Sequence, residues 1–242
     1  MSFSSSLGQD GGLHPTLHVH INPGKGPRCP LYLMLSAPPS FIIDRFQLAQ
    51  LHQDGRLGFS YSYERNHRSN DLPTLSTRGY LDLEQPVIRA GSSSLLLRVA
   101  KNSTALEDSI ELDIPLHLRY QRPSLDAASS LKAVELPGPR VFWLCSQNDR
   151  ELDHACPPDV ALKSHLSGCG EFTALYLQPL DRSGVVFCDN PPVPYPHLLQ
   201  VPTGVLADLP LVEKVNTGVV WAMAVLIALV LLRRRPQAHV DR

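Results

Sequence analysis

The chain has 242 residues, enough for one large or two small folded units. Its 22 basic and 23 acidic side chains nearly cancel, which excludes a polycationic surface for nucleic acid and an acidic tail. Proline supplies 22 residues. Because proline interrupts helix interiors and central strands, a mostly helical protein is disfavoured. The hydrophobic fraction of 43% is sufficient for a packed core.

Short apolar segments separated by proline, glycine and serine recur along the chain after residues 1–14, which we expect to be disordered. In the first segment Leu17, Val19 and Ile21 alternate with polar residues. Similar segments follow at 31–35, 57–63, 95–99, 141–145, 172–177 and 185–188. This spacing predicts an all-β protein, an antiparallel sandwich or barrel, and disfavours βαβ units.

One helix is predicted after Asp44. Asp44 is a suitable N-cap, Gln47 completes a capping box, and Ile43 can pack against Leu48 as a hydrophobic staple. The side chains that we expect to face the core are Phe46, Ala49 and Leu51.

The longest predicted strand is Ile110–Tyr120. Its apolar positions all fall on one face of a period-two ribbon: Ile110, Leu112, Ile114, Leu116, Leu118 and Tyr120. The other face carries Glu111, Asp113, Pro115, His117 and Arg119. Since Pro115 cannot donate a ladder hydrogen bond, the strand is expected at a sheet edge or with a bulge.

Polar and aromatic residues in and just after this strand are candidates for docking another protein: His117, Arg119, Tyr120 and Arg122. An edge strand carrying histidine, arginine and tyrosine suits protein recognition. The alternative, an ordinary solvated strand face, stays open.

A membrane-spanning helix is predicted near the C-terminus. Val215–Leu232 has 18 residues without a formal charge and is followed by Arg233, Arg234 and Arg235. Such a helix is about 27 Å long, close to the ~30 Å hydrocarbon core of a bilayer. We therefore expect a span at 211–232, a short basic cytosolic tail at 233–242 and a luminal ectodomain at 15–205.

This orientation requires a translocation signal, and the first residues lack the apolar core of one. We therefore expect an alternative or incomplete start, or else a tail-anchored protein with a cytosolic ectodomain. Asn102 begins an N-x-[ST] sequon and would be a luminal glycan acceptor.

The chain has five cysteines. Four of them, Cys145, Cys156, Cys169 and Cys188, can form two disulfides in an oxidising lumen, with the pairing left open and Cys29 left over. An alternative is a zinc-dependent hydrolase with the ligands His154, Cys156, His165 and Cys169. Their spacing fits no familiar zinc finger, and no catalytic motif accompanies it, so we expect no enzyme activity, metal or cofactor.

Several motifs, in order, resemble those of the PIG-X family. Ile114–Pro123 (IPLHLRYQRP) resembles the signature segment of the family, and Val141–Cys145 (VFWLC) resembles its strand with cysteine and tryptophan. Pro38–Leu51 is similar to its helix entry, and Leu199–Gly204 to its pre-membrane segment.

The resemblance implies an accessory subunit of glycosylphosphatidylinositol (GPI) mannosyltransferase I, a single-pass type I glycoprotein of the endoplasmic reticulum membrane. The partner implied is the polytopic catalytic subunit, PIG-M. It transfers the first mannose from dolichol-phosphate-mannose to the glucosaminyl-phosphatidylinositol intermediate. A polyprenyl-phosphate sugar requires a site framed by several spans, so we expect a non-catalytic role for a chain with one span. The alternative is a cell-surface adhesion or receptor ectodomain with the same topology.

Overall fold

A computed structural model describes residues 2–8, 13–24, 26–54, 57, 73–100, 109–125, 130–146, 156–167, 169, 171–180 and 194–233. The chain divides into two compact units. The first comprises Met1–Gln121 with Lys132–Val201, and the second comprises Arg122–Leu131 with Pro202–Arg242.

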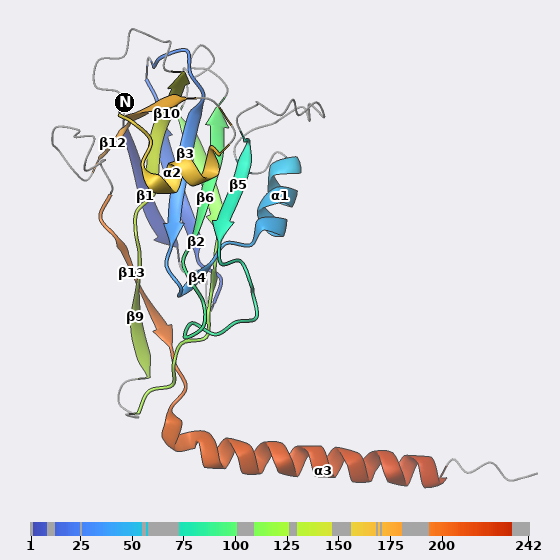
Figure 1. The fold of residues 1–242 in the computed structure, drawn as a ribbon. Helices are drawn as coiled ribbons and strands as arrows, with labels where there is room; N and C mark the ends of the chain where they lie inside the picture. The colour runs from blue at the N-terminus through green and yellow to red at the C-terminus, as the bar shows by residue number, and fades with distance from the viewer. Residues whose placement is uncertain are drawn as a thin grey trace, which may run out of the picture. The chain divides into compact units, whose positions relative to one another are not determined.

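The first unit is built on two sheets (Figure 1). The four-stranded sheet has the order β12 (Gln178–Pro179), β1 (Ser2–Gly8), β2 (Thr16–Asn22), β7 (Ile110–Pro115). The five-stranded sheet has the order β11 (Phe172–Tyr176), β10 (Arg140–Ser146), β3 (Leu31–Ala37), β6 (Ser93–Ala100), β5 (Leu75–Gly79). Neighbouring strands in both are antiparallel, except that β1 and β12 are parallel. The predicted all-β, sandwich-like fold is confirmed.

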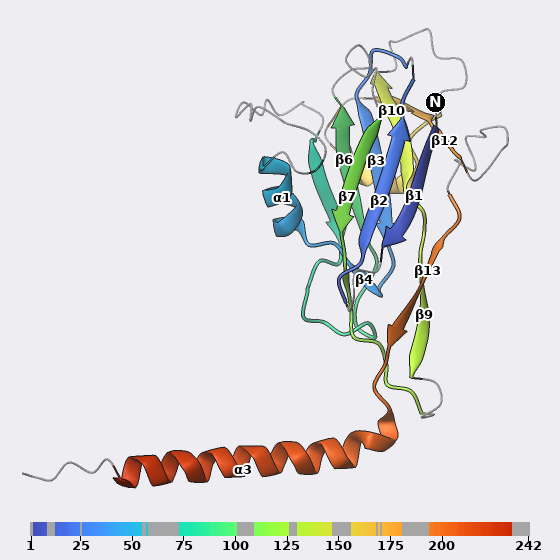
Figure 2. The same ribbon diagram turned by 180° about the vertical axis from the view of Figure 1, so that it is seen from behind.

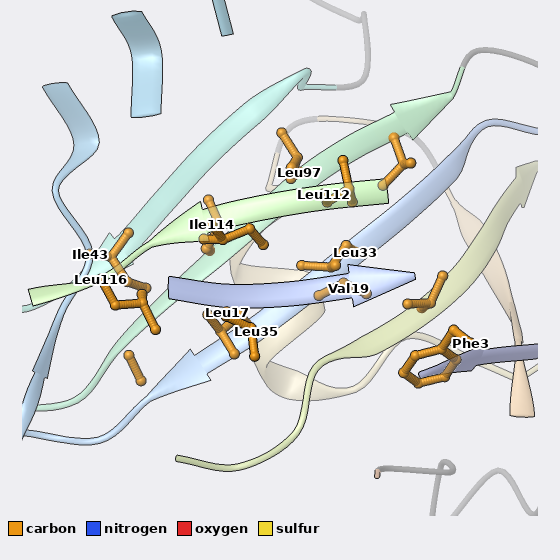
Figure 3. Close-up of a cluster of buried hydrophobic side chains, with 14 of the residues drawn as sticks. Phe3, Leu17, Val19, Leu33, Leu35, Ile43, Leu97, Leu112, Ile114 and Leu116 are labelled. Atoms are coloured by element: carbon orange, nitrogen blue, oxygen red, sulfur yellow. The ribbon is translucent and has the colours of Figure 1, made fainter. Parts of the chain in front are cut away.

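The main core lies between the two sheets, which face each other in Figure 2. On β2 the residues Leu17, Val19 and Ile21 are buried and their polar neighbours are exposed, as the alternation predicts. Figure 3 shows side chains of β2 and β7 meeting those of β3 and β6 across this layer. Burial of one face of each sheet fixes the strand register, because a one-residue slip would expose that face.

The five-stranded sheet is also covered on its other face. Tyr32 and Met34 of β3 point away from the main core and pack with Leu162 and Leu166, from the helix α2 (Val160–His165) and its C-terminal end. α2 crosses the outer face of this sheet in Figure 1. Two-sided burial explains why β3 is almost entirely apolar. Sequence periodicity did not predict α2, whose six residues are too few for a clear helical period.

The N-terminal residues differ from the expectation. Ser2–Gly8 form β1, and all seven pair with β2, so the prediction of disorder over 1–14 is wrong for this part. Phe3 is fully buried in the main core. The serine-rich sequence conceals the strand because Phe3 is its one buried anchor.

The predicted helix is α1 (Arg45–Gln53), with Asp44 as its N-cap. The Asp44 carboxylate accepts hydrogen bonds from the backbone N–H groups of Phe46 (2.9 Å) and Gln47 (3.2 Å). Leu48 is fully buried, as a staple with Ile43 requires. Phe46 is 68% exposed, so its expected place in the core is wrong. It lies instead against the Arg45 guanidinium, whose carbon is 4.6 Å from the ring centroid.

The long predicted strand is divided at its proline. β7 ends at Pro115, and the chain continues into β8 (His117–Leu118), which pairs with β4 (Phe41–Ile42) and not with β2. β7 is an edge strand, as Pro115 predicts. A further two-stranded sheet joins β9 (Leu131–Leu136) to β13 (His197–Pro202).

The second unit contains a single turn, η2 (Leu206–Asp208), followed by α3 (Leu209–Arg233). Among the described residues, Leu206–Arg233 is the one helical stretch long and apolar enough to cross a membrane, and none of it is buried. The predicted span 211–232 lies within α3. The predicted strands at 58–63 and 185–188 lie outside the described residues.

The packing of β7 gives a stability prediction. Leu112→Ala, in the main core, should lower the free energy of unfolding by about 2–5 kcal/mol, because the apolar contacts are lost and a cavity remains. Urea titration of the purified chain, followed by the fluorescence of the buried Trp143, measures this change. Glu111→Ala, on the exposed face of the same strand, is the matched control and should have little effect. Equal losses in both variants would contradict this placement of the core.

Candidate functional site

The segment that resembles the family signature leaves the four-stranded sheet at Pro115 and runs along a separate path. The backbone N–H groups of Leu116 and Leu118 donate to the carbonyls of Pro15 (2.9 Å) and Leu13 (2.8 Å). The N–H of Arg119 then donates to the carbonyl of Ser40 at 2.9 Å. Both leucines are buried in the main core, so this part of the segment serves the fold.

Arg119 is buried, with an exposed fraction of only 2%. Its Nη1 donates to the carbonyl oxygens of Asp82 (2.5 Å) and Gln85 (2.8 Å). Its guanidinium carbon lies 5.7 Å from the centroid of the Tyr80 ring. Burial lowers the pKa of Arg119, while Asp82 and Tyr80 oppose the shift. The side chain stays protonated at neutral pH, and the buried cation fastens the segment 80–85 to the signature segment.

The stretch between β5 and β6 is held at further points. The N–H of Tyr80 donates to the carbonyl of Ser92 (3.2 Å), and that of Val87 donates to the carbonyl of Tyr120 (3.4 Å). Within the stretch, the N–H of Arg89 donates to the carbonyl of Pro86 (3.0 Å). Residues 80–89 therefore form an ordered loop around Arg119 and Tyr120.

Three large apolar side chains of this region face the solvent: Leu83 (47% exposed), Ile88 (52%) and Tyr120 (77%). We call them the signature surface. Leu83 lies between Asp82 and Gln85, whose carbonyls accept hydrogen bonds from Arg119. Ile88 directly follows Val87, whose N–H donates to the carbonyl of Tyr120. Exposed aromatic and aliphatic side chains held on an ordered backbone are suited to binding another protein.

His117, two residues before Arg119, contacts other parts of the chain than Arg119 does. Its Nδ1 is 2.8 Å from Nδ1 of His14, and its Nε2 is 3.0 Å from Oε1 of Gln47. Burial lowers the pKa of His117, and His14 lowers it further, while Asp44 opposes them. A neutral His117 can donate from Nε2 to Gln47 and accept at Nδ1 from His14. It thereby links β8 to α1 and to the segment before β2.

The four candidate docking residues do not share one face. Arg119 was expected on the solvated face of the strand, and this is wrong. Leu118 and Arg119 are both buried, because the loop 80–89 covers the side of the chain that would otherwise meet solvent. His117 is half-buried, and Tyr120 is exposed although the alternation placed it with the core. Arg122 is exposed and belongs to the second unit.

The disulfides also differ from the expectation. Cys29 is bonded to Cys145, with 5.1 Å between their Cα atoms, so the prediction that Cys29 would be left over is wrong. Both lie in the main core, where the bond ties the segment before β3 to β10. Cys156 is also disulfide-bonded. Cys169 is half-buried beyond α2, while Cys188 and the sequon residue Asn102 lie outside the described residues.

The zinc alternative conflicts with the chemistry around two of its four ligands. Cys156 is held in a disulfide and has no thiolate to offer a metal. His165 is 3% exposed, and its Nδ1 and Nε2 lie 2.9 Å from Oγ of Ser76 and 2.8 Å from Oγ of Ser94. Because both ring nitrogens are hydrogen-bonded to serines, His165 joins α2 to β5 and β6. His154 lies outside the described residues.

The fold and the surface define a β-sandwich domain that exposes an apolar, aromatic loop surface and is followed by a helix able to span a membrane. The PIG-X / PBN1 family profile matches residues 10–232. The chain belongs to the PIG-X / PBN1 family. Membership supports a role in the biosynthesis of GPI anchors.

Three fungal proteins illustrate the similarity to curated relatives. Protein PBN1 of Gibberella zeae is 33% identical over 157 residues, which cover 62% of this chain and 29% of that protein. Protein pbn1 of Schizosaccharomyces pombe is 32% identical over 157 residues, covering 63% and 43%. Protein PBN1 of Yarrowia lipolytica is 30% identical over 159 residues, covering 63% and 28%. The match thus spans less than half the length of these relatives.

The Arg119 contacts give a second prediction. Arg119→Met should lower the free energy of unfolding by about 2–3 kcal/mol, because the carbonyls of Asp82 and Gln85 lose a charged donor. Hydrogen exchange at the Val87 amide should accelerate, since the loop loses its attachment. Arg122→Met, at an exposed arginine nearby in sequence, should leave both quantities unchanged. Unaltered exchange at Val87 in Arg119→Met would contradict the anchoring role.

His165 gives a prediction about pH. Burial, with Arg78 adding to it, lowers the pKa of His165 to about 4 from the ordinary 6.5. Between these values the unfolded chain binds a proton that the folded chain does not, so stability falls as the pH drops from about 6.5 to 4. His165→Gln removes the part of this pH dependence that comes from the His165 imidazole.

The measurement compares urea unfolding at pH 7 and pH 5. The wild type should lose up to about 2 kcal/mol more than His165→Gln over this range. Val160→Ala, at an 86% exposed position on α2 without a titratable group, is the control and should keep the pH dependence of the wild type. Identical pH dependence in wild type and His165→Gln would show that His165 titrates normally.

Proposed function

We propose that the chain is a non-catalytic, stabilising subunit of the endoplasmic reticulum mannosyltransferase that adds the first mannose in GPI-anchor biosynthesis. Its β-sandwich lies in the lumen, α3 crosses the membrane over about 211–232, and residues 233–242 form a cytosolic tail. The observation that carries the proposal is the match of residues 10–232 to the PIG-X / PBN1 family, an accessory-subunit family.

The disulfides support the luminal placement. The structure holds the Cys29–Cys145 bond and a second bond at Cys156, and these three cysteines are each at most 4% exposed. Disulfides of this kind form and persist in oxidising compartments and are rare in the cytosol. With the sandwich in the lumen, Arg233 at the end of α3 lies on the cytosolic side, in agreement with the positive-inside rule.

The signature surface is the proposed contact with the polytopic catalytic subunit, PIG-M in family terms. Leu83 and Ile88 offer exposed apolar area, and Tyr120 adds an aromatic side chain of a type enriched among the energetically dominant residues of interfaces. Arg119 acts here as a positioning residue that holds the loop. A subunit that binds only the folded partner stabilises it by mass action, by about 2.7 kcal/mol at a hundredfold excess over Kd.

Substitution of the signature surface tests this contact. The double variant Leu83→Asp, Tyr120→Ala should reduce co-purification of the catalytic subunit from detergent-solubilised membranes about tenfold or more, because two interface anchors are lost. Val160→Asp, at an 86% exposed position on α2, is the control and should co-purify like the wild type. Equal thermal unfolding temperatures of the double variant and the Val160→Asp control show that the double variant is folded. Wild-type recovery of the partner by the double variant would contradict the contact.

The alternative, an adhesion or receptor ectodomain at the cell surface, gains no support from the family match. The glycan at the predicted acceptor Asn102 separates the two functions. A subunit of the endoplasmic reticulum should carry a glycan that endoglycosidase H removes, and Asn102→Gln should abolish the mobility shift. A resistant glycan in the wild type would mark passage through the Golgi and favour the cell surface.

A further inference from the structure

The second unit holds an exposed leucine next to the beginning of the apolar helix. Leu125 is 85% exposed, in the segment Arg122–Leu131, which ends at the first residue of β9. Ser124, directly before it, is bonded to the residues that lead into η2 and α3. Its N–H donates to the carbonyl of Gly204 at 2.7 Å, and its carbonyl accepts from the N–H of Leu206 at 2.8 Å.

These two bonds form a parallel bridge between Ser124 and Val205. A third bond, from the N–H of Thr203 to the carbonyl of Ser130 (2.7 Å), fastens the other end of the loop to the same stretch. Ser124 and Ser130 are therefore both attached to residues 203–206, the last of which begins η2. Wherever the helix enters a membrane, Ser124 and Leu125 therefore stay beside the residues that lead into it.

The depth of that entry point follows from the length of the helix. A hydrocarbon core of ~30 Å takes about 20 helical residues, so a core that ends at Leu232 begins near Glu213. Residues 209–212 then occupy about 6 Å above it, which is the thickness of the headgroup layer. Leu206, the hydrogen-bond partner of Ser124, lies at the outer side of this layer.

The side chains around this point match the lipid headgroup region. Leu125, Leu206, Leu209 and Leu211 are all exposed, with fractions between 45% and 85%. The loop also presents the exposed Arg122 three residues before Leu125. A cationic side chain beside aliphatic ones is the composition of segments that lie in a membrane interface, because the cation meets lipid phosphates and the aliphatic groups enter the acyl boundary.

We propose that the segment 122–125 docks on the luminal headgroup layer beside α3, with Leu125 inserted into the interface and Arg122 facing lipid phosphates. This contact gives the chain a second, peripheral attachment to the bilayer. It rests on the proposed function in one respect, the insertion of α3 into the membrane.

Quenching of tryptophan fluorescence by brominated lipids tests the contact in the full chain reconstituted in phosphatidylcholine nanodiscs. Trp221→Phe removes the native tryptophan of α3, and Leu125→Trp adds a probe to the loop. Val160→Trp in the same background is the control, because Val160 is equally exposed and belongs to the first unit. Trp143, buried in the core, contributes the same background to every variant.

Lipids brominated near the glycerol end of the acyl chain should lower the fluorescence of the Leu125→Trp probe roughly twofold and leave that of the Val160→Trp probe unchanged. Addition of Arg122→Glu should weaken the quenching, since the phosphate contact becomes repulsive. Equal Leu125→Trp fluorescence in brominated and ordinary nanodiscs would overturn the inference.

The unmodified Trp221 separates this outcome from a failure of the proposed topology. In the wild type, lipids brominated near the methyl end of the chain should quench Trp221 if α3 is inserted. Quenching of Trp221 without quenching of Leu125→Trp refutes only the loop contact. Absence of both refutes the insertion of α3 and, with it, the topology on which the proposed function depends.

Discussion

The burial of the Arg119 guanidinium governs the geometry of the region proposed to bind a partner. A buried cation is costly unless its donors are satisfied. Here Nη1 bonds two carbonyls of the loop 80–89, whereas Nε and Nη2 have no hydrogen-bond partner among the described residues. The same loop donates a hydrogen bond from Val87 N–H to the carbonyl of Tyr120, so a segment without regular secondary structure gains a defined position. Leu83, Ile88 and Tyr120 are consequently held outward on a fixed backbone. Fixing these side chains before binding lowers the entropy lost on association.

This region depends in turn on the sandwich beneath it. Leu116 and Leu118 fill the main core immediately before Arg119, and the Cys29–Cys145 bond crosses the same core. The five-stranded sheet is covered on both faces, by the other sheet and by α2, and a buried neutral histidine joins that helix to two strands. The scaffold is therefore packed independently of the loops, which leaves the loops available for recognition.

The alternation of β2 and β7 and the capping residues of α1 were sufficient to predict the sandwich and its helix, because period and capping are local properties of the chain. Arg119 shows where such reasoning stops. The period-two pattern placed it opposite the core, but the loop 80–89, more than thirty residues earlier, covers it. The partner of Cys29 was equally hidden, since Cys145 lies 116 residues away and only the packing of β3 against β10 brings them together. Both errors come from contacts distant in sequence.

The lifetime of the catalytic mannosyltransferase subunit in cells reports most directly whether this chain acts by stabilising a membrane partner. After removal of the chain, a pulse–chase experiment should show the newly made catalytic subunit decaying severalfold faster, because its folded form loses the binding free energy. Re-expression of the wild-type chain should restore the slow decay. An unchanged lifetime of the catalytic subunit in cells that lack the chain would contradict the proposed role.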